Sequence, residues 1–346
     1  MVLTCSATNG AGLSASYPLT IKVDQTPPTI AGSRAPVANA AGWNNATVTV
    51  TFVCTDNLSG VYLLSPTSIT LSSAGTSQMA GSTCQDLAGN TASQVVAGIN
   101  IDKMPPVTTS LAANPNPVVI NASITVSASL SDSGGSGLSG ADYSVNGCVP
   151  TLLSPASGAS AQVAATVPPF TMAGVYQLCV HGRDVAGNVG TDECFFLPVY
   201  DPSGGFVTGG GWINSPAGAY ALNPSLTGKA TFGFVSKYQP GANSPGGDTQ
   251  FQFRVADLNF RSSSYQWLVV AGARAQYKGS GTINQTGSYQ FLLTAIDGDL
   301  PGGGGIDRFR IKIWSGGGIV YDNQMGADDN GDPTTALGGG SIVIHK

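Results

Sequence analysis

Acidic and amide side chains recur near the end of the chain at a spacing that suits a metal ion. Asp328, Asn330 and Asp332 occupy the first, third and fifth positions of one loop. Hard oxygen ligands at alternate positions of a tight turn are typical of calcium sites. Asp297 and Asp299 would supply further oxygens if the fold brings them close. The glutamate that closes an EF-hand loop is missing, so two interpretations stay open: a calcium site, or Asx turns solvated by water.

Residues able to catalyse a reaction are scarce. The two histidines, His181 and His345, belong to no His-Glu-x-x-His motif, and the chain has no Gly-x-Ser-x-Gly elbow. We interpret both as surface or edge residues. A pair of carboxylates could hydrolyse a glycoside. The candidate acids lie among glycines, without any Glu: Asp297, Asp299, Asp307 and Asp322. We therefore expect a non-enzymatic protein.

Aromatic side chains could build a platform on which a sugar stacks. Trp267 and Trp314 stand in apolar stretches, which favours packing in the core. Tyr265 and Tyr277 have more polar neighbours. These two tyrosines are therefore the first candidates for contact with a carbohydrate.

The composition restricts the elements that can carry these residues. Charged residues make up 10% of the 346, the formal net charge is −5, and only 14 residues are Lys or Arg. This is too few for a nucleic-acid surface, while 42% hydrophobic residues argue against a disordered chain. Gly numbers 47, and Glu occurs once, as Glu193, which disfavours helices. No run of 18 apolar residues could span a membrane.

Three motifs recur in the same order along the first 202 residues. They are a junction with Asp before proline, an acidic residue early in each unit, and the sequence Asp-x-Ala-Gly-Asn, whose residues favour a turn. The copies are Asp24, Asp102 and Asp201 for the junction, Asp56 and Asp132 for the early acid, and 86–90 and 184–188 for the turn. Two complete units and the tail of a third are therefore expected.

Apolar and polar residues alternate within the units, which predicts strands with one buried face. Val48, Val50 and Phe52 alternate with threonines in the first unit. The junction aspartates are 78 and 99 residues apart, which gives the length of each unit. A unit of this length that contains seven short strands fits an immunoglobulin-like (Ig-like) sandwich. Tandem units joined by prolines favour an extended string over a closed barrel.

The ordered motifs resemble the bacterial Ig-like repeats of large exported surface proteins. This resemblance covers residues 1–202 and implies spacer or adhesive stalk modules that do not catalyse reactions. We expect the C-terminal hairpin of a truncated repeat at 1–24, Ig-like domains at 25–103 and 104–202, and a Gly-rich C-terminal β-domain at 203–346.

The composition changes after Pro202, where Gly supplies 28 of the remaining 144 residues. Strand-like alternation continues between Gly-rich breaks, so a β-sandwich or jelly-roll-like domain is expected. Several segments resemble the C-terminal domain of bacterial exported proteins that follows Ig-like or "choice-of-anchor" domains: 205–213, 232–238, 267–274 and 320–344. The resemblance implies an extracellular or cell-surface location rather than an activity.

Six cysteines in an exported protein predict disulfides. Cys54 lies on an early strand and Cys84 on the strand before the turn, as in the bridge between the sheets of an immunoglobulin domain. Cys179 and Cys194 are equally far from the middle of the second turn, so a symmetric hairpin would place them opposite each other. Cys148 is a competing partner for either of these two.

The leading hypothesis is a non-enzymatic structural or adhesive segment of a bacterial exported protein, in which Ig-like spacers present a terminal β-domain. The first 24 residues match only the last hairpin of a repeat. Two interpretations stay open. In the first, this hairpin or a sheet edge associates with another copy of the chain. In the second, the hairpin is what truncation left of a repeat, and Cys5 lost its partner in the same way. The alternative function is a calcium-assisted carbohydrate-binding module.

Overall fold

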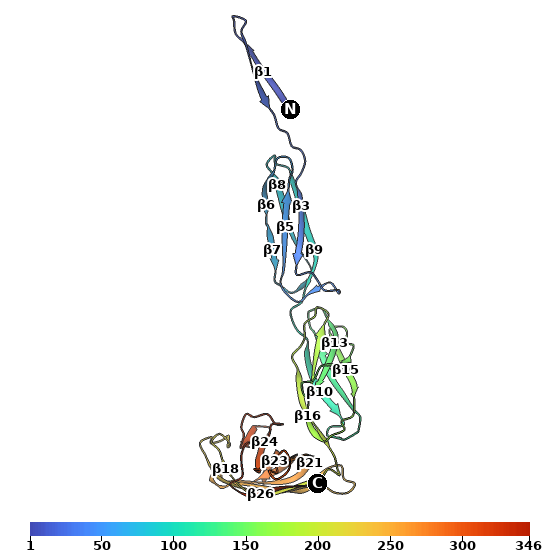
Figure 1. Cartoon of the computed structure of the whole chain (residues 1–346), viewed down its shortest axis with the longest axis vertical. Coiled ribbons are helices and arrows are strands. Elements are labelled where there is room, and N and C mark those ends of the chain that lie inside the picture. The colour runs from blue at the N-terminus through green and yellow to red at the C-terminus, as the bar shows by residue number, and fades with distance from the viewer.

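The computed structural model describes all 346 residues and consists almost entirely of strands and loops. A hairpin, two sandwiches and a C-terminal sheet follow one another along the long axis of the molecule (Figure 1). This confirms the all-β prediction. The single helical segment is a 3-10 turn at Arg254–Ala256. No helix is long and apolar enough to cross a membrane.

The chain begins with a two-stranded hairpin of β1 (Val2–Thr8) and β2 (Ser14–Thr20). Every residue of both strands is exposed, and the hairpin stands beyond the first sandwich at one end of the molecule (Figure 1). The side chain of Asn9 shapes the turn, because its Oδ1 accepts the N–H groups of Ala11 and Leu13 at 3.1 and 3.0 Å.

The first Ig-like unit packs a three-stranded sheet (β3-β5-β7) on a four-stranded sheet (β4-β9-β8-β6). Its strands are β3 (Thr29–Ala35), β4 (Trp43–Asn44), β5 (Val48–Thr55), β6 (Val61–Ser65), β7 (Ser68–Leu71), β8 (Gly75–Asp86) and β9 (Thr91–Ile101). On β5, Val48, Val50 and Phe52 are buried and form the core with residues of β8 and β9. The predicted alternation is confirmed here.

The second unit repeats this plan with sheets β10-β12-β15 and β11-β17-β16-β13-β14. Its strands are β10 (Val107–Asn114), β11 (Val118–Val119), β12 (Ile124–Ser131), β13 (Leu138–Val145), β14 (Thr151–Ser154), β15 (Ser160–Val167), β16 (Gly174–Asp184) and β17 (Glu193–Tyr200). In both units the turn Asp-x-Ala-Gly-Asn joins the last two long strands. Its glycine adopts a φ of 93° in the first unit and 95° in the second, a conformation that glycine adopts without strain.

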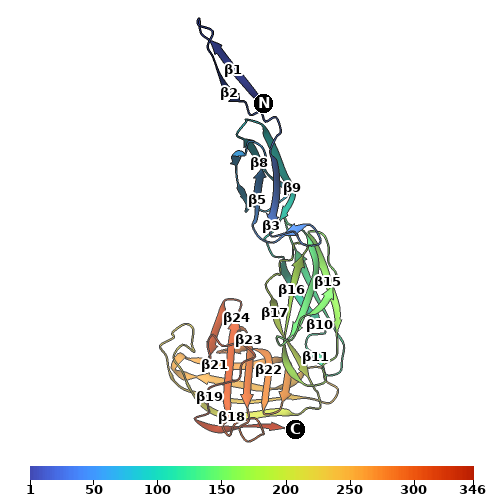
Figure 2. The same cartoon turned by 45° about the horizontal axis from the view of Figure 1, so that its top comes forward.

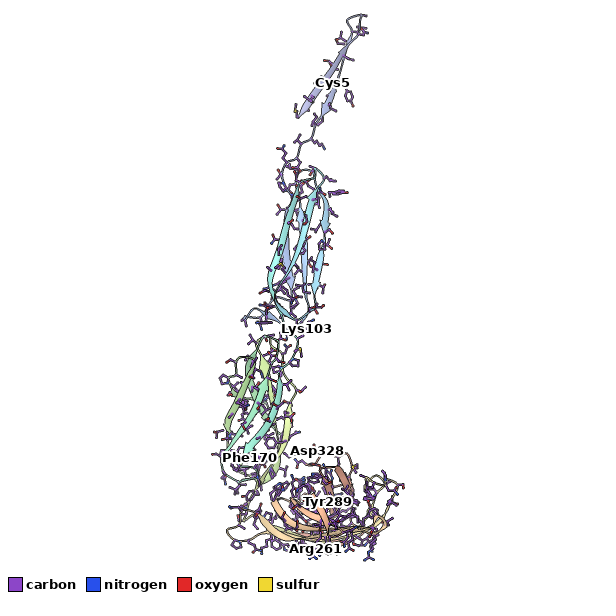
Figure 3. The ribbon with its side chains drawn as sticks, turned by 180° about the vertical axis from the view of Figure 1, so that it is seen from behind. Cys5, Lys103, Phe170, Arg261, Tyr289 and Asp328 are labelled. Atoms are coloured by element: carbon purple, nitrogen blue, oxygen red, sulfur yellow. A yellow bond between two sulfur atoms is a disulfide. The ribbon has the colours of Figure 1, made fainter.

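Both predicted disulfides are present. Cys54 on β5 bonds to Cys84 on β8 and so joins the two sheets of the first unit. Cys179 bonds to Cys194 across the β16–β17 hairpin, where the register places the two residues opposite each other. Cys5 and Cys148 are exposed and unpaired, and Figure 3 labels Cys5 on the N-terminal hairpin.

The C-terminal domain is one antiparallel sheet of nine strands in the order β25-β24-β23-β22-β21-β20-β19-β18-β26. Its strands are β18 (Phe206–Ser215), β19 (Gly228–Tyr238), β20 (Pro245–Phe253), β21 (Leu258–Ala271), β22 (Arg274–Ile283), β23 (Thr286–Ile296), β24 (Arg308–Ser315), β25 (Gly318–Asp322) and β26 (Gly339–His345). Neighbours in sequence are neighbours in the sheet, except that β26 returns to pair with β18.

This sheet folds over on itself to enclose a core. Phe232 on β19 stacks on Phe309 on β24, with ring centroids 4.1 Å apart, although four strands separate β19 from β24 in the sheet. The Tyr321 ring on edge strand β25 packs on Phe251 on β20 at 4.6 Å. A single curled sheet therefore supplies both layers of the sandwich, and its core holds 27 buried residues.

Candidate metal centres at the unit junctions

The three recurring aspartates of each repeat meet at one place. Asp24, Asp56 and Asp86 bring one carboxylate oxygen each within 4.8 Å of one another at the head of the first unit. At the head of the second unit, the corresponding aspartates are gathered in the same way: Asp102, Asp132 and Asp184. We call these groups the first triad and the second triad. Each combines a linker residue with two loops of the unit that the linker enters.

Backbone groups orient the carboxylates of the first triad. The N–H groups of Thr26 and Ser59 donate to Asp24 Oδ1 and Oδ2 at 2.9 and 3.1 Å. Asp56 Oδ1 accepts N–H groups from its own loop. The carboxylate of Asp86 accepts two hydrogen bonds from Asn90, the last residue of its turn.

The second triad is held in the same manner. The Ser136 N–H donates to Asp102 Oδ2 at 2.6 Å, and the Gly137 N–H donates to Asp132 Oδ2 at 2.7 Å. Asp184 Oδ1 accepts N–H groups from the turn that follows it. Two loops of different sequence, 56–60 and 132–137, thus present their first aspartate to the linker in equivalent positions.

The asparagine of each Asp-x-Ala-Gly-Asn turn forms hydrogen bonds both to the linker and to the triad. Asn90 Nδ2 donates to Asp86 Oδ2 at 2.7 Å and to the Asp24 carbonyl at 3.3 Å. Asn188 makes the same two contacts in the second unit, at 2.7 and 3.0 Å. The motif therefore does more than close a hairpin, because its first and last residues also position the junction.

The second triad concentrates negative charge in the interior. Asp102, Asp132 and Asp184 are only 1%, 4% and 3% exposed. Burial raises the pKa of Asp132, and the charges of the other two carboxylates raise it further, against the hydrogen bond from its loop. The first triad is more open, and hydrogen bonds, chiefly from Ser59, lower the pKa of Asp24. No Lys, Arg or His forms an ion pair with any of the six aspartates.

Such a group of oxygens fits a calcium ion. Ca²⁺ binds oxygens at about 2.3–2.6 Å, so two oxygens on one ion are at most about 5 Å apart. The 4.8 Å limit within each triad satisfies this condition. Calcium takes six to eight ligands in flexible geometry, and water or main-chain carbonyls can complete the shell of three carboxylates.

The second triad lies directly at the contact between the two Ig-like units. The Asp102 N–H donates to the Asn44 carbonyl at 2.9 Å, and Asn39 Nδ2 donates to the Val185 carbonyl in the turn of the second unit at 2.8 Å. Lys103, labelled between the units in Figure 3, donates to two oxygens of the first unit. A ligand of this triad would bind where the two units meet.

The third junction has a different chemistry. Asp201 accepts hydrogen bonds only from its own turn and joins no triad. Instead, Tyr200 is buried and stacks on Tyr238 of the C-terminal sheet, with ring centroids 5.0 Å apart. Asn330 Nδ2 also donates to the Val175 carbonyl of the second unit at 2.9 Å. Aromatic packing and a hydrogen bond join these two domains.

The calcium site predicted at 328–332 is not supported, because basic side chains occupy that loop. Arg274 forms an ion pair with Asp332 at 3.1 Å and donates to both the side-chain and the main-chain oxygen of Asn330. Arg310 donates to the Asp328 carbonyl at 2.6 Å. Guanidinium groups thus supply the positive charge that a calcium ion would bring. Figure 3 shows Asp328 on the side of the C-terminal domain that faces the second unit.

The remaining candidate acids hold the C-terminal domain together. Asp297 and Asp307 each accept a backbone N–H of β26, at 2.9 and 2.7 Å. Asp322 forms a buried ion pair with Arg310 at 2.9 Å, and Asp299 is exposed. These residues form no carboxylate group comparable to the triads. They therefore do not join the 328–332 loop in a group of carboxylates that could share one ion.

The two histidines lie in different domains and have structural partners. His181 Nδ1 is 2.8 Å from Asp192 Oδ1, and its Nε2 is 3.4 Å from Asp142 Oδ2. Its side chain is 13% exposed on an inner strand, so the prediction of a surface or edge position is wrong for His181. His345 lies on edge strand β26, as expected, with Nε2 3.1 Å from Thr208 Oγ1.

Of the two tyrosines predicted to contact a sugar, Tyr277 is buried and Tyr265 is partly buried. Tyr277 is 0% exposed, and its hydroxyl is 2.9 Å from Thr249 Oγ1, which also lies 2.8 Å from the Tyr265 hydroxyl. Burial raises the pKa of both phenols. Burial contradicts the prediction of a ligand contact for Tyr277, whereas for Tyr265 it stays a prediction. Trp267 packs in the core and Trp314 against it, as expected.

Sequence reasoning did not identify the triads, although it identified every residue in them. From the sequence, only Asp86 and Asp184 are expected in turns, whereas the other four aspartates mark the junctions and the early part of each unit. The signal that would have revealed the sites is the joint recurrence: one aspartate in each of three motifs, in the same order, twice. Only the fold shows that the three motifs lie at the same end of the sandwich.

No known protein family and no curated protein sequence matches this chain. Among solved structures, the chain is similar to fibronectin(III)-like modules of Clostridium thermocellum CbhA, with 14% identity and a TM-score of 0.30 over 49% of this chain and 94% of that one. It is also similar to the N-terminal eight Ig domains of the Down Syndrome Cell Adhesion Molecule, with 13% identity and a TM-score of 0.31 over 89% of this chain and 38% of that one. These likenesses concern the fold alone.

Proposed function

We propose that this chain is a non-enzymatic structural or adhesive segment of an extracellular protein, and that calcium bound by the two triads holds its Ig-like units in line. The observation that carries the proposal is the second triad, three buried carboxylates without a basic partner at the contact between the units. A cation there would bind the linker aspartate and two loops of the second unit at once.

Charge makes the cation necessary for a stable junction. Carboxylates buried side by side repel one another, and burial without a partner is costly. Without a cation, the easiest relief is for the linker carboxylate of Asp102 to move away from Asp132 and Asp184. That movement would also loosen the Asn188 contact with the linker. The angle between the units would then vary, and with calcium it would be fixed.

The extracellular location and the spacer role have separate support. The two disulfides and the Ig-like sandwiches fit a protein outside the cell. The resemblance of the repeat motifs supports a bacterial origin. The histidines and carboxylates have structural partners in different domains, which supports a role in presentation rather than catalysis.

The proposal is tested by the dimensions of the molecule in solution. Small-angle scattering of the whole chain should give a longer and narrower distance distribution with calcium than with a chelator. The double variant Asp132→Asn, Asp184→Asn replaces two of the repelling carboxylates with amides, so its distance distribution should be the same with calcium and with a chelator. Asp299→Asn is the matched control, because Asp299 is exposed and lies in no triad. A wild-type distribution that is the same with calcium and with a chelator would refute the proposal.

A second function, self-association, is favoured by the N-terminal hairpin. The register places Leu3, Cys5 and Ala7 opposite Leu19, Tyr17 and Ala15, so that all six lie on one face; five are apolar and Cys5 is only weakly polar. Leu3, Tyr17 and Leu19 are 39%, 74% and 47% exposed. We propose that this face packs on the same face of a second copy. At high protein concentration, light scattering should then show fewer copies of the chain per particle after residues 1–20 are deleted. An unchanged number of copies per particle would refute self-association through the hairpin.

A further inference from the structure

A cleft of about 420 Å³ lies between the second Ig-like unit and the C-terminal sheet. Phe196 and Pro198 on β17 line one side, and Lys278 and Trp314 on β22 and β24 line the other. Figure 2 shows β16 and β17 running down to this part of the C-terminal sheet. The volume falls within the range of about 300–1,000 Å³ that is usual for ligand pockets.

The wall formed by the C-terminal sheet carries one unpaired positive charge. Asp329 binds Lys312, with oxygens 2.7 and 3.0 Å from Lys312 Nζ. Lys278 forms no hydrogen bond or ion pair with the chain, and its Nζ lies 5.6 Å from the centroid of the Trp314 ring. Burial lowers the pKa of Lys278; the charge of Asp329 opposes this effect, and the charge of Lys312 adds to it. Two lysines and one aspartate leave an excess of one positive charge.

A fixed hydrogen-bond acceptor stands beside this charge. Gln276 is 1% exposed, and its Nε2 donates to Thr294 Oγ1 at 2.9 Å and to the Asp329 carbonyl at 2.7 Å. These two bonds fix the amide, and they leave its Oε1 free to accept a hydrogen bond from a ligand. Gln276 lines the cleft together with Lys278 and Trp314.

We propose that this cleft binds a carboxylated sugar, a hexuronate residue of an acidic glycan. The carboxylate would pair with the Lys278 ammonium, a ring hydroxyl would donate to Gln276 Oε1, and the C–H face of the pyranose would pack on Trp314 and the apolar wall of β17. A flat ring with one apolar face, several hydroxyl donors and a single negative charge matches this combination of groups. A neutral sugar would leave the ammonium unpaired, which is costly in a partly buried site.

The site is independent of the calcium triads, because its lining residues come from the third junction. Its test therefore has to exclude calcium, since polyuronates also bind calcium ions. Titrations in a chelating buffer remove that contribution. Under these conditions, absence of uronate binding would not bear on the proposal that the triads bind calcium. Absence of calcium binding by the triads would likewise not bear on uronate binding in the cleft.

In the experiment, the whole chain is titrated with a digalacturonate, and binding is measured by isothermal titration calorimetry and by tryptophan fluorescence. Lys278→Met keeps the length of the side chain and removes the charge, so affinity should fall about tenfold or more. Trp314→Phe should reduce the fluorescence change, and the remainder should come from Trp267, which also lines the cleft. Lys229→Met is the control, because Lys229 Nζ lies 4.7 Å from the Trp212 ring centroid, outside the cleft, and should bind as the wild type does.

Four outcomes would overturn the proposal. The first is no binding of the digalacturonate by the folded wild type, and the second is equal affinity of Lys278→Met and wild type. The other two come from two competing probes, digalactose and an acetylated aromatic amino acid. Equal affinity for digalactose would refute charge recognition, and tighter binding of the amino acid would show that the cleft takes a peptide carboxylate instead of a sugar.

Discussion

The substitution Asp132→Asn should have opposite effects on stability in the absence and in the presence of calcium. Asp132 is 4% exposed and accepts one hydrogen bond, from the Gly137 N–H to its Oδ2. An asparagine oxygen can accept the same hydrogen bond. The amide NH₂ then replaces a charged oxygen that faces Asp102 and Asp184, and it can donate to them.

Without calcium, the variant should be more stable than the wild type. The change removes repulsion between buried like charges and can add a hydrogen bond to a carboxylate, together worth on the order of 1 kcal/mol. With calcium, the order should reverse. Extracellular calcium modules have a Kd of about 10⁻⁴–10⁻³ M. About 10 mM calcium is therefore roughly 10 to 100 times Kd and stabilises the wild-type site by about 1.4 to 2.7 kcal/mol.

The assay is calorimetric unfolding of the whole chain in a chelating buffer and in calcium. For a unit of about 100 residues, a change of 1 kcal/mol moves Tm by roughly 4–8 °C. The transition of the second unit should therefore rise by about 6–20 °C with calcium in the wild type and by much less in the variant. Asp299→Asn provides the control, because its effect should be the same in both buffers.

Two results would refute the reasoning. If Asp132→Asn destabilises the chelated protein, the three carboxylates do not repel one another and the triad is a satisfied hydrogen-bond network. If calcium raises Tm equally in wild type and variant, the ion binds elsewhere. Asp56→Asn repeats the comparison in the first unit, where a more open triad should show a smaller gain without calcium.

Three further results are expected. Replacing Cys54 and Cys84 by serine should lower the free energy of unfolding by about 2–4 kcal/mol in urea, because the bridge spans 30 residues; an unchanged value would mean that the bridge does not form in solution. Arg310→Met should cost about 3–5 kcal/mol by the same measurement, since it leaves the buried Asp322 unpaired, and the double variant with Asp322→Leu should recover part of the loss. Burial raises the pKa of Tyr277 well above its usual value, so in alkaline solution its proton remains bound in the folded state and is released on unfolding. The free energy of unfolding should therefore fall as the pH rises above about 10. If the native protein showed phenolate absorbance from all of its tyrosines near pH 10, this prediction would be wrong.

The sequence predicted those features that depend on neighbouring residues. Alternation along Val48, Val50 and Phe52 was enough to assign the buried face of β5, because side chains alternate across a strand. The pairing of Cys179 with Cys194 followed from their equal distance from the turn, since an antiparallel register is fixed by the hairpin that joins the strands. Both inferences need only local geometry.

Apart from the Cys54–Cys84 bridge, which follows from the likeness to an immunoglobulin domain, features that depend on distant residues could not be predicted. The environment of Tyr277 is set by Thr249 and by the folding of a nine-stranded sheet over itself, and no local pattern shows that a single sheet will curl. The acidic loop at 328–332 has the spacing of a calcium site. Arg274, more than 50 residues away in sequence, neutralises the loop, and its position depends on the tertiary fold.

The distribution of charge along the chain supports the cation at the junctions. The first 202 residues contain ten acidic and four basic residues, a net charge of −6, whereas the C-terminal domain has nine acidic and ten basic residues. In the C-terminal domain, Asp322 pairs with Arg310 and Asp329 with Lys312, whereas the buried carboxylate of Asp297 has no basic partner and accepts backbone N–H groups. In the Ig-like units, six of the ten acids are gathered in two triads, and none of the four basic residues pairs with them. Gathering like charges in this way is unfavourable without a counter-charge. This supports the proposal that a divalent ion binds at the junctions, and on that proposal the straightness of the two units should depend on the calcium concentration around them.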